Sequence, residues 1–227
     1  MLDLDQKILF FINGSQSLFL DNLAYVLTSG ITWIPLYLAL LYLVIKNNET
    51  MKQILLIIGF ALVCVLLSEF VTDFIIKPIV GRLRPTIDPS IKYLVHTVDN
   101  LRGSQYSFFS AHAANTCCIA VFFSLLIRNS IFTAAMLIWS ILNCWTRVYL
   151  GLHYPSDIFC GFLYGAIVGL CIYVIFLKLY FKFSPKFNYI SSQYTSTGYC
   201  LTDVEAVLIV LAFTFIYAIV RSLIIFV

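Results

Sequence analysis

Six long apolar stretches dominate this sequence of 227 residues and most constrain its fold. They cover approximately residues 17–45, 53–76, 110–127, 131–145, 157–181 and 204–225. A helix needs roughly 20 apolar residues to cross the hydrocarbon core of a bilayer. Because lipid offers no partners to backbone polar groups, such stretches form helices. We therefore expect an all-α polytopic membrane protein, a single domain over residues 1–227 with six transmembrane helices in a bundle.

The composition excludes several other classes of protein. Hydrophobic residues make up 61% of the chain and charged residues only 11%, against about 45–50% and about 25% in ordinary soluble domains. A disordered chain, a nucleic-acid binder and a small disulfide-stapled module are all excluded. The net charge of +3 does not by itself imply a polyanionic partner.

The segments outside the spans suggest how one end of the bundle is covered. Residues 1–16 have the pattern of a short amphipathic segment, and Gly30 is a candidate bend within the first span. The loop 86–108 mixes apolar and polar residues, so it is a candidate lid or head-group selector on the membrane surface. The aromatic residues Trp33, Trp139, Trp145, Tyr106 and Tyr149 are interpreted as members of the interfacial aromatic belt.

Three clusters of polar residues lie at the ends of spans that six crossings would bring to one membrane face. They are Lys77-Pro-Ile-Val-Gly-Arg82-Leu-Arg84-Pro85, then Ser110-Ala111-His112, and then Arg147 with His153 and Asp157. Cations of this kind match the charge on a phosphoryl group in its transition state. The start of a helix adds backbone N–H donors. Two histidines can divide nucleophilic and proton-transfer work, and an aspartate can orient one of them.

Each cluster also has a purely structural interpretation. Cations beside a span commonly reach toward lipid head groups. Ser110 has the position of a helix cap, and His153 and Asp157 have the spacing of a first-turn pair. The convergence of all three clusters at one face favours a phosphate site.

The spacing within the clusters resembles the three-part signature of the type 2 phosphatidic acid phosphatase family, which is similar to the vanadium haloperoxidases. Six residues separate Lys77 from Arg84-Pro85, and a Ser-x-His follows. Five residues then separate Arg147 from His153, and three separate His153 from Asp157. The signature region spans 77–157. It departs from the family where Pro-Ser-Gly-His becomes Phe-Ser-Ala-His.

The resemblance implies roles for individual residues. His153 would be the nucleophile that forms a phosphohistidine, Asp157 would orient it, and His112 would be the general acid. The phosphate would be held by Lys77, Arg84, Ser110, the backbone around Ala111, and Arg147. No metal or other cofactor is implied.

Two further charged residues are candidates for secondary roles. Asp73 lies one helical turn before Lys77, so it either pairs with Lys77 and sets its position or takes part in a proton path or head-group contact. Arg82 lies outside the signature and is a candidate for binding a second phosphate or a lipid head group.

The resulting functional hypothesis is an integral membrane phosphatase acting on a lipid phosphate or diphosphate held in the bilayer. Isoprenyl diphosphate carriers and lipid A phosphates rank ahead of phosphatidylglycerophosphate and phosphatidic acid. A phosphotransferase using the same site and a catalytically silent lipid-binding scaffold are the alternatives. No nucleic-acid partner is expected.

The basic residues outside the signature indicate an orientation. Those at the end away from the clusters are Lys46, Lys52, Arg128, Lys178, Lys182 and Lys186, against Lys7, Lys92, Arg102 and Arg221 at the cluster end. Six against four favours the first end as cytoplasmic, although including the signature cations and Arg82 reverses the count to six against eight. We expect a bacterial inner-membrane protein with its site on the periplasmic face.

Overall fold

The computed structural model describes residues 2–15, 17–182 and 192–224, and these residues are helical apart from turns, loops and two isolated β-bridges. The predicted all-α class is confirmed. The helices are α1 (Leu2–Asn13), α2 (Leu18–Thr28), η1 (Gly30–Trp33), α3 (Ile34–Lys46), α4 (Met51–Phe70), η2 (Val71–Ile76), α5 (Lys77–Val80), α6 (Ala111–Ile127), α7 (Ser130–Tyr149), α8 (Pro155–Tyr180) and α9 (Leu201–Ile224).

The long helices make the chain an integral membrane protein. Four helical runs among the described residues are long and apolar enough to cross a bilayer, and α2 with η1 and α3 forms a fifth if this pair, bent by 67°, is one span. Helix α6 has the apolar character of a span but only 17 residues. The predicted count of six is therefore not confirmed by length and composition.

The second span extends farther than the sequence indicates. Helix α4 continues through the π-helical turn η2 into α5, so Lys77 lies within the helical run instead of after it. The run ends at Gly81, whose φ of +62° is a conformation that glycine adopts without steric cost. Helix α7 likewise continues to Tyr149, which places Arg147 on a helix and not in a connection.

The bend predicted at Gly30 is present, and neighbouring side chains satisfy the carbonyls that it frees. Thr32 Oγ1 donates to Val26 O at 2.6 Å, and Trp33 Nε1 donates to Leu27 O at 2.9 Å. A helix can break at membrane depth only when such partners are supplied. The break thereby fixes where α2 ends, at Thr28.

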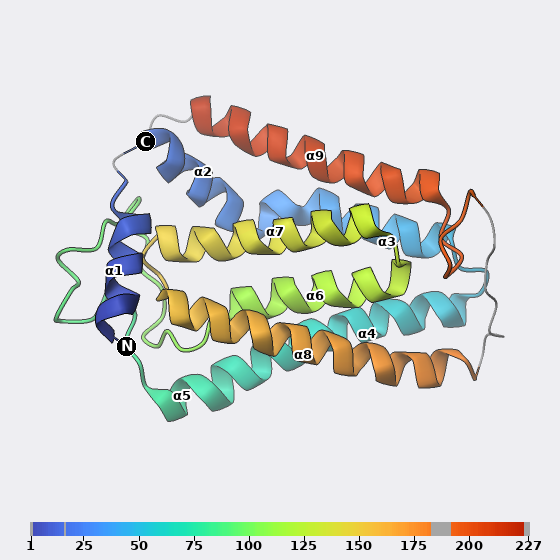
Figure 1. Ribbon diagram of the computed structural model, residues 1–227, viewed down its shortest axis with the longest axis horizontal. Coiled ribbons are helices and arrows are strands. Elements are labelled where there is room, and N and C mark those ends of the chain that lie inside the picture. Colours follow the sequence, from blue (N-terminus) through green and yellow to red (C-terminus); the bar gives the residue numbers. More distant parts are fainter. Residues whose placement is uncertain (1, 16, 183–191, 225–227) are drawn as a thin grey trace.

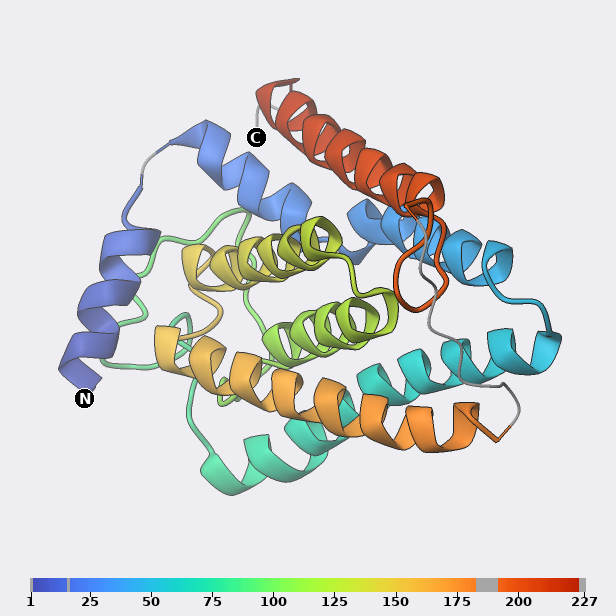
Figure 2. The same ribbon diagram turned by 45° about the vertical axis from the view of Figure 1, so that its right-hand side comes forward.

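Helix α6 lies at the centre of the bundle, between α7, α8 and α4 (Figures 1 and 2). Three glycines of α8 spaced by four residues, Gly161, Gly165 and Gly169, allow the close approach of α6. A Cβ atom at Gly161 would lie 2.6 Å from Ser110 O, and one at Gly169 would lie 2.8 Å from Cys118 O. This small-xxx-small pattern is typical of helix contacts in membranes.

The aromatic-belt interpretation is wrong for Tyr149, which is 1% exposed and donates to Asp21 Oδ1 at 2.7 Å. It is also wrong for Trp33 and Trp139. Both side chains are buried, at 2% and 0% exposure, and their rings meet edge to face with centroids 5.7 Å apart. They bury apolar area in the bundle core, and the Trp33 N–H is used at the helix break. The lipid-facing surface instead carries aliphatic and Phe side chains such as Leu66, Phe159 and Phe213.

One end of the bundle, on the left in Figure 1, is covered by α1 and the loop 86–108. Helix α5 ends, α6 and α8 begin, and α7 ends at this same end. Leu9 of α1 packs with Ile91 and Val95 of the loop, and all three are buried. Tyr93 and Leu94 of the loop are exposed. The loop is thus packed over the end where the three polar clusters meet.

Candidate active site

The structure brings the first and third clusters into direct contact. Arg84 Nη1 lies 3.1 Å from His153 Nε2 and donates to Leu152 O at 3.0 Å. Both side chains are buried, Arg84 at 5% and His153 at 2% exposure. A contact between residues 69 positions apart is a product of the fold, and it joins the two clusters at one point.

The Arg84 contact determines the tautomer of His153. A guanidinium has only hydrogen-bond donors, so His153 Nε2 must accept and its lone pair faces Arg84. The ring proton of the neutral imidazole therefore lies on Nδ1. That nitrogen is 3.6 Å from Asp157 Oδ2, beyond a good hydrogen bond but within ion-pair range.

The local chain geometry holds Arg84 against His153. Arg84 Nη2 donates to Ser104 Oγ at 2.9 Å, and Gly103 packs so closely that a Cβ would lie 2.6 Å from the guanidinium carbon. Gly151, two residues before His153, has a φ of +66°. A residue with a side chain could not easily approach Arg84 as closely as Gly103 does, nor adopt the positive φ of Gly151.

Thr28, at the end of α2, links the second and third clusters. Arg147 Nη1 donates to Thr28 Oγ1 at 2.8 Å, and the Thr28 backbone hydrogen-bonds the His112 side chain. The buried Nε of Arg147 has no hydrogen-bond partner. Arg147 therefore has donor capacity left for an anion.

The second cluster forms the start of α6. Ser110 is fully buried, and its Oγ caps the helix by accepting from Ala113 N at 3.4 Å. Its own N–H donates to Asp157 O at 3.1 Å. The structural interpretation of Ser110 as a cap is therefore correct, and Ala111 begins the helix at the position where backbone N–H groups are free for an anion.

The predicted pairing of Asp73 with Lys77 is confirmed. Lys77 Nζ lies 2.5 Å from Asp73 Oδ1, and the Lys77 side chain is buried. Asp73 sits in the π-helical turn η2, an irregularity often found at functional sites. The pair holds the Lys77 charge near His153, whose titration responds to it.

Arg82 does not lie open to a second phosphate. Its Nη1 donates to Asp157 Oδ1 at 2.8 Å and its Nη2 to Asp5 Oδ2 at 2.7 Å, while its guanidinium stacks 3.8 Å over the Tyr154 ring. Two carboxylates and an aromatic face thus occupy the cation. Asp5 is a residue that the sequence did not single out, because it lies 77 positions from Arg82 in an otherwise ordinary amphipathic helix.

The surroundings of His153 keep its imidazole neutral. Burial, followed by the positive charges of Arg84, Arg147 and Lys77, holds the pKa of His153 well below its usual range. A neutral imidazole keeps one ring nitrogen unprotonated, here Nε2, which is the form required of a nucleophile. The same cations leave an excess of positive charge that an anion would neutralise.

A largely apolar cavity of about 470 Å³ leads to His112. It lies between α3 and α4, and Thr28, His112 and Asn115 are among its polar lining residues. Tyr37 and Leu62 line it and are also exposed on the outer surface, so the cavity opens sideways between these helices. Its shape suits an apolar chain that enters from the bilayer.

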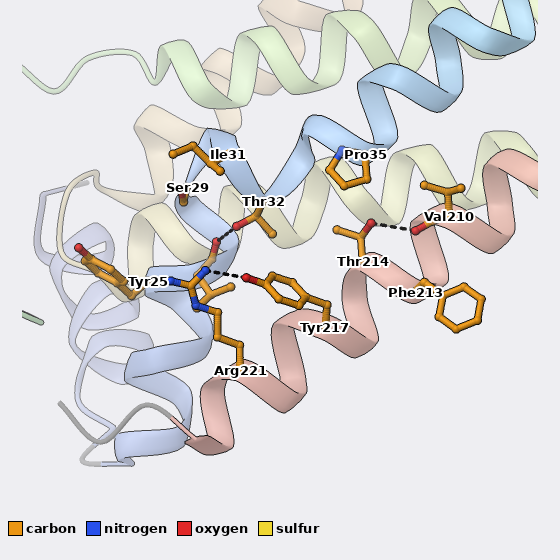
Figure 3. A pocket seen from close by; sticks show the side chains of 11 residues that line it. Tyr25, Ser29, Ile31, Thr32, Pro35, Val210, Phe213, Thr214, Tyr217 and Arg221 are labelled. Carbon is orange, nitrogen blue, oxygen red and sulfur yellow. Dashed lines mark hydrogen bonds between the residues drawn. The ribbon is translucent and has the colours of Figure 1, made fainter.

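A second cavity of about 500 Å³ lies on the other side of the helix break, between η1 and α9 (Figure 3). Its lining includes Thr32, Thr214 and Arg221, with Arg221 Nη1 donating to Tyr217 Oη at 2.7 Å. None of the residues predicted for the phosphate site lines it. Among the described residues there is also no group of three or more His, Cys, Asp or Glu side chains arranged to hold a metal ion.

Comparison with known proteins yields one family. Residues 53–181 match the family model described as PAP2 superfamily. Two relatives named lipid A 4'-phosphatase are similar over 78% of this chain. That of Bacteroides thetaiotaomicron is 35% identical over 79% of its own length. That of Porphyromonas gingivalis is 32% identical over 75% of its own length.

Solved structures agree in fold. The crystal structure of Aquifex aeolicus LpxE is 25% identical, with a TM-score of 0.54 over 77% of this chain and 95% of that chain. A transmembrane PAP2-type phosphatidylglycerolphosphate phosphatase from Bacillus subtilis is 19% identical, with a TM-score of 0.57 over 81% of this chain and 88% of that one. The resemblance drawn from the three motifs is confirmed.

Proposed function

Because the chain belongs to the PAP2 superfamily and is a membrane phosphatase, we propose that it cleaves a lipid phosphate through a phosphohistidine formed on His153. The observation that carries this proposal is the contact between Arg84 Nη1 and His153 Nε2. It points the nucleophilic lone pair at a cation that would bind a phosphate oxygen. A phosphoryl group placed there meets the nucleophile and a phosphate-binding donor together.

In the first step His153 Nε2 attacks phosphorus, a P–N bond forms, and the P–O bond to the lipid breaks. The charge on the phosphoryl oxygens is stabilised by three cations, Arg84, Arg147 and Lys77. Ser110 and the backbone N–H groups at Ala111 contribute further hydrogen-bond donors. His112, at the inner, polar end of the cavity between α3 and α4, donates a proton to the leaving lipid oxygen.

In the second step water attacks the phosphohistidine. His112, now neutral, accepts a proton from that water, the P–N bond breaks and inorganic phosphate is released. Asp157 stabilises the positive charge that His153 acquires in the first step and fixes the proton on Nδ1. No step calls for a metal or another cofactor.

For the substrate we favour a lipid A phosphate over an isoprenyl diphosphate. Two relatives with more than 30% identity carry the name lipid A 4'-phosphatase, while a phosphatidylglycerophosphatase B of Haemophilus influenzae matches over only 38% of this chain. The lateral cavity between α3 and α4 would receive an acyl chain while the sugar phosphate reaches His153. These matches also favour an enzyme over a silent scaffold.

We further propose six crossings with the site on the periplasmic face of a bacterial inner membrane. The 17 residues of α6 span about 26 Å at 1.5 Å per residue, close to the roughly 30 Å of a bilayer core. Lys46, Lys52 and Arg128 lie at the end of the bundle away from the site, as do Lys178 and Lys182. Of the six residues counted there, Lys186 lies outside the described residues.

The test is phosphate release by purified protein in detergent from lipid A, isoprenyl diphosphate, phosphatidylglycerophosphate and phosphatidic acid. We expect release from lipid A to be fastest and unaffected by EDTA, and an acid-labile phosphoenzyme to appear on rapid quenching with labelled substrate. Release from none of these lipids, or strict dependence on added magnesium, would refute the proposal. Transfer of label to a second lipid instead of water would establish the phosphotransferase alternative.

A further inference from the structure

A chain of charged side chains, all buried except the half-buried Arg82, leads from His153 to helix α1. Asp157 faces His153 with Oδ2 and accepts from Arg82 Nη1 with Oδ1 at 2.8 Å. Arg82 Nη2 then donates to Asp5 Oδ2 at 2.7 Å. Asp157 is fully buried and Asp5 is 7% exposed. Such buried polar networks are rigid when every member has a partner.

Ser156 closes the network between the two carboxylates. Its N–H and Oγ both donate to Asp5, and its Oγ accepts from Arg82 Nη1 at 2.7 Å. Tyr154 N donates to Asp157 Oδ2 at 3.0 Å, while the Tyr154 ring covers the guanidinium. Each Asp157 carboxylate oxygen therefore accepts from its own donor, and these two hydrogen bonds fix the orientation of the carboxylate.

We propose that Arg82 and Asp5 are positioning residues that act on His153 through Asp157, and that α1 is consequently part of the catalytic unit. This inference rests on the phosphohistidine mechanism proposed above. Arg82 holds Oδ1 so that Oδ2 faces Nδ1 of His153. Asp5 holds Arg82 in turn and offsets its charge, so that Arg82 neither withdraws Asp157 from His153 nor competes for the phosphate.

Helix α1 has docking contacts other than those of Asp5. Leu9 and Asn13 follow Asp5 at intervals of four residues and lie on the same buried face. Asn13 Nδ2 donates to Tyr149 O at 2.6 Å and to His96 O at 2.8 Å. The opposite face exposes apolar side chains, with Phe11 at 89% exposure. Loss of the Asp5 charge should therefore disturb the network and leave the helix docked.

The test compares Asp5→Asn and Arg82→Gln with wild-type enzyme in a lipid phosphatase assay. We expect kcat to fall by about 10- to 100-fold, as for other residues that orient a catalytic group, with KM within about twofold because neither side chain meets substrate. Arg82→Lys should restore part of the lost kcat. Glu49→Gln and Arg128→Gln, both exposed at the end of the bundle away from the site, are the matched controls and should retain wild-type rates.

The decisive measurement is the kcat of a double variant that combines Arg82→Gln with Asp157→Asn. If Arg82 acts through Asp157, Arg82→Gln should lower kcat no further in that background, whereas a merely structural or independent role predicts that the losses multiply. Thermal unfolding in detergent reports whether each variant is folded, and Asp5→Asn provides the milder perturbation if Arg82→Gln is not.

Three results would overturn the inference: multiplicative losses, an unchanged kcat, or a raised KM with weakened inhibition by inorganic phosphate. The last would make Arg82 a phosphate ligand. Failure of the proposed function is a separate result, seen in wild-type protein that releases no phosphate or forms no phosphohistidine. Wild-type protein that passes both checks isolates the role of Arg82 and Asp5.

Discussion

The broken segment Gly30–Trp33 separates two apolar cavities of similar size. The cavity between α3 and α4 holds about 470 Å³ and the cavity beside α9 about 500 Å³. The first reaches His112 at its polar end, and Thr28 in its wall binds Arg147. The second ends on Arg221, which is exposed and bonded to Tyr217.

The difference between the two cavities is electrostatic. Three cations, Arg84, Arg147 and Lys77, lie around His153, and the nearby carboxylates do not neutralise all of their charge. The Nε atoms of Arg84 and Arg147 are buried without hydrogen-bond partners. Buried groups of this kind are costly unless an anion binds. Among the residues that line the cavity beside α9, the one cation, Arg221, is exposed, so its charge is not desolvated and requires no ligand. An apolar cavity becomes a candidate active site only where such unneutralised charge adjoins it.

The largest expected effect is the loss of the nucleophile. His153→Ala should lower phosphate release by at least about 10³-fold, because removing a nucleophile leaves only binding and electrostatic contributions. Arg221→Gln, in the other cavity, should stay within twofold of wild type. Phosphate release from both variants, normalised to folded protein, checks this. Substantial turnover by His153→Ala would contradict the assignment.

A smaller effect, dependent on substrate, is expected at His112. His112→Ala should slow cleavage of a lipid phosphate by about 10²- to 10⁴-fold, the usual range for a general acid. Cleavage of p-nitrophenyl phosphate should suffer much less, because its leaving group needs no proton. Measuring kcat for both substrates provides the check. Equal losses would remove His112 from the general-acid role.

Filling each cavity in turn tests which one receives the lipid chain. Ala61→Phe should raise KM for a lipid substrate by about tenfold or more, while p-nitrophenyl phosphate, which has no chain, is cleaved as before. Val210→Phe fills the cavity beside α9 and should change neither. Steady-state kinetics on purified variants distinguish the two. A KM increase for Val210→Phe alone would assign the lipid to the other cavity.

The smallest expected effect is a shift in pH dependence. Because burial and neighbouring cations lower the pKa of His153, its neutral form persists below the ordinary value of about 6.5. The acid limb of kcat/KM due to His153 should therefore lie below pH 6.5. Lys77→Gln removes one cation, raises the pKa of His153 and should move this limb to higher pH. If the acid limb of kcat/KM lies at the same pH in Lys77→Gln as in wild type, with the same substrate, this account is contradicted.

The same shift affects folding stability with a defined sign. As the pH falls below about 6.5 the unfolded chain binds a proton at His153 before the folded protein does, so stability decreases with acidification. Thermal unfolding of wild type and His153→Ala across that range should diverge, with the variant less sensitive to acid.

Much of the site followed from residue types and their spacing. Lys77, Arg84, Arg147 and two histidines are costly beside a membrane, and only an anion accounts for all of them together. The pairing of Asp73 with Lys77 followed from their separation by one helical turn. The glycines of α8 were not singled out in the sequence, and their spacing alone would not identify α6 as their partner.

Other features depended on contacts between distant segments. Arg82 was predicted as a candidate for binding a second phosphate or a lipid head group, but in the fold it binds Asp157 and Asp5. Trp33 is a residue type common in the aromatic belt, but the helix break at Gly30 directs its side chain toward the core. Residue type indicates what a side chain can bind, whereas its actual partner depends on what the fold places nearby.

The amino-acid sequence by itself determined that this chain forms apolar helices and carries a phosphate-binding signature, because bilayer burial and anion charge each demand particular residue types. The tertiary structure alone decided which cavity reaches His112, and that Arg82 pairs with Asp157 and Asp5. Those outcomes depend on α1, the break after α2 and the close approach of α6 to α8, contacts that span many tens of residues and leave no local pattern.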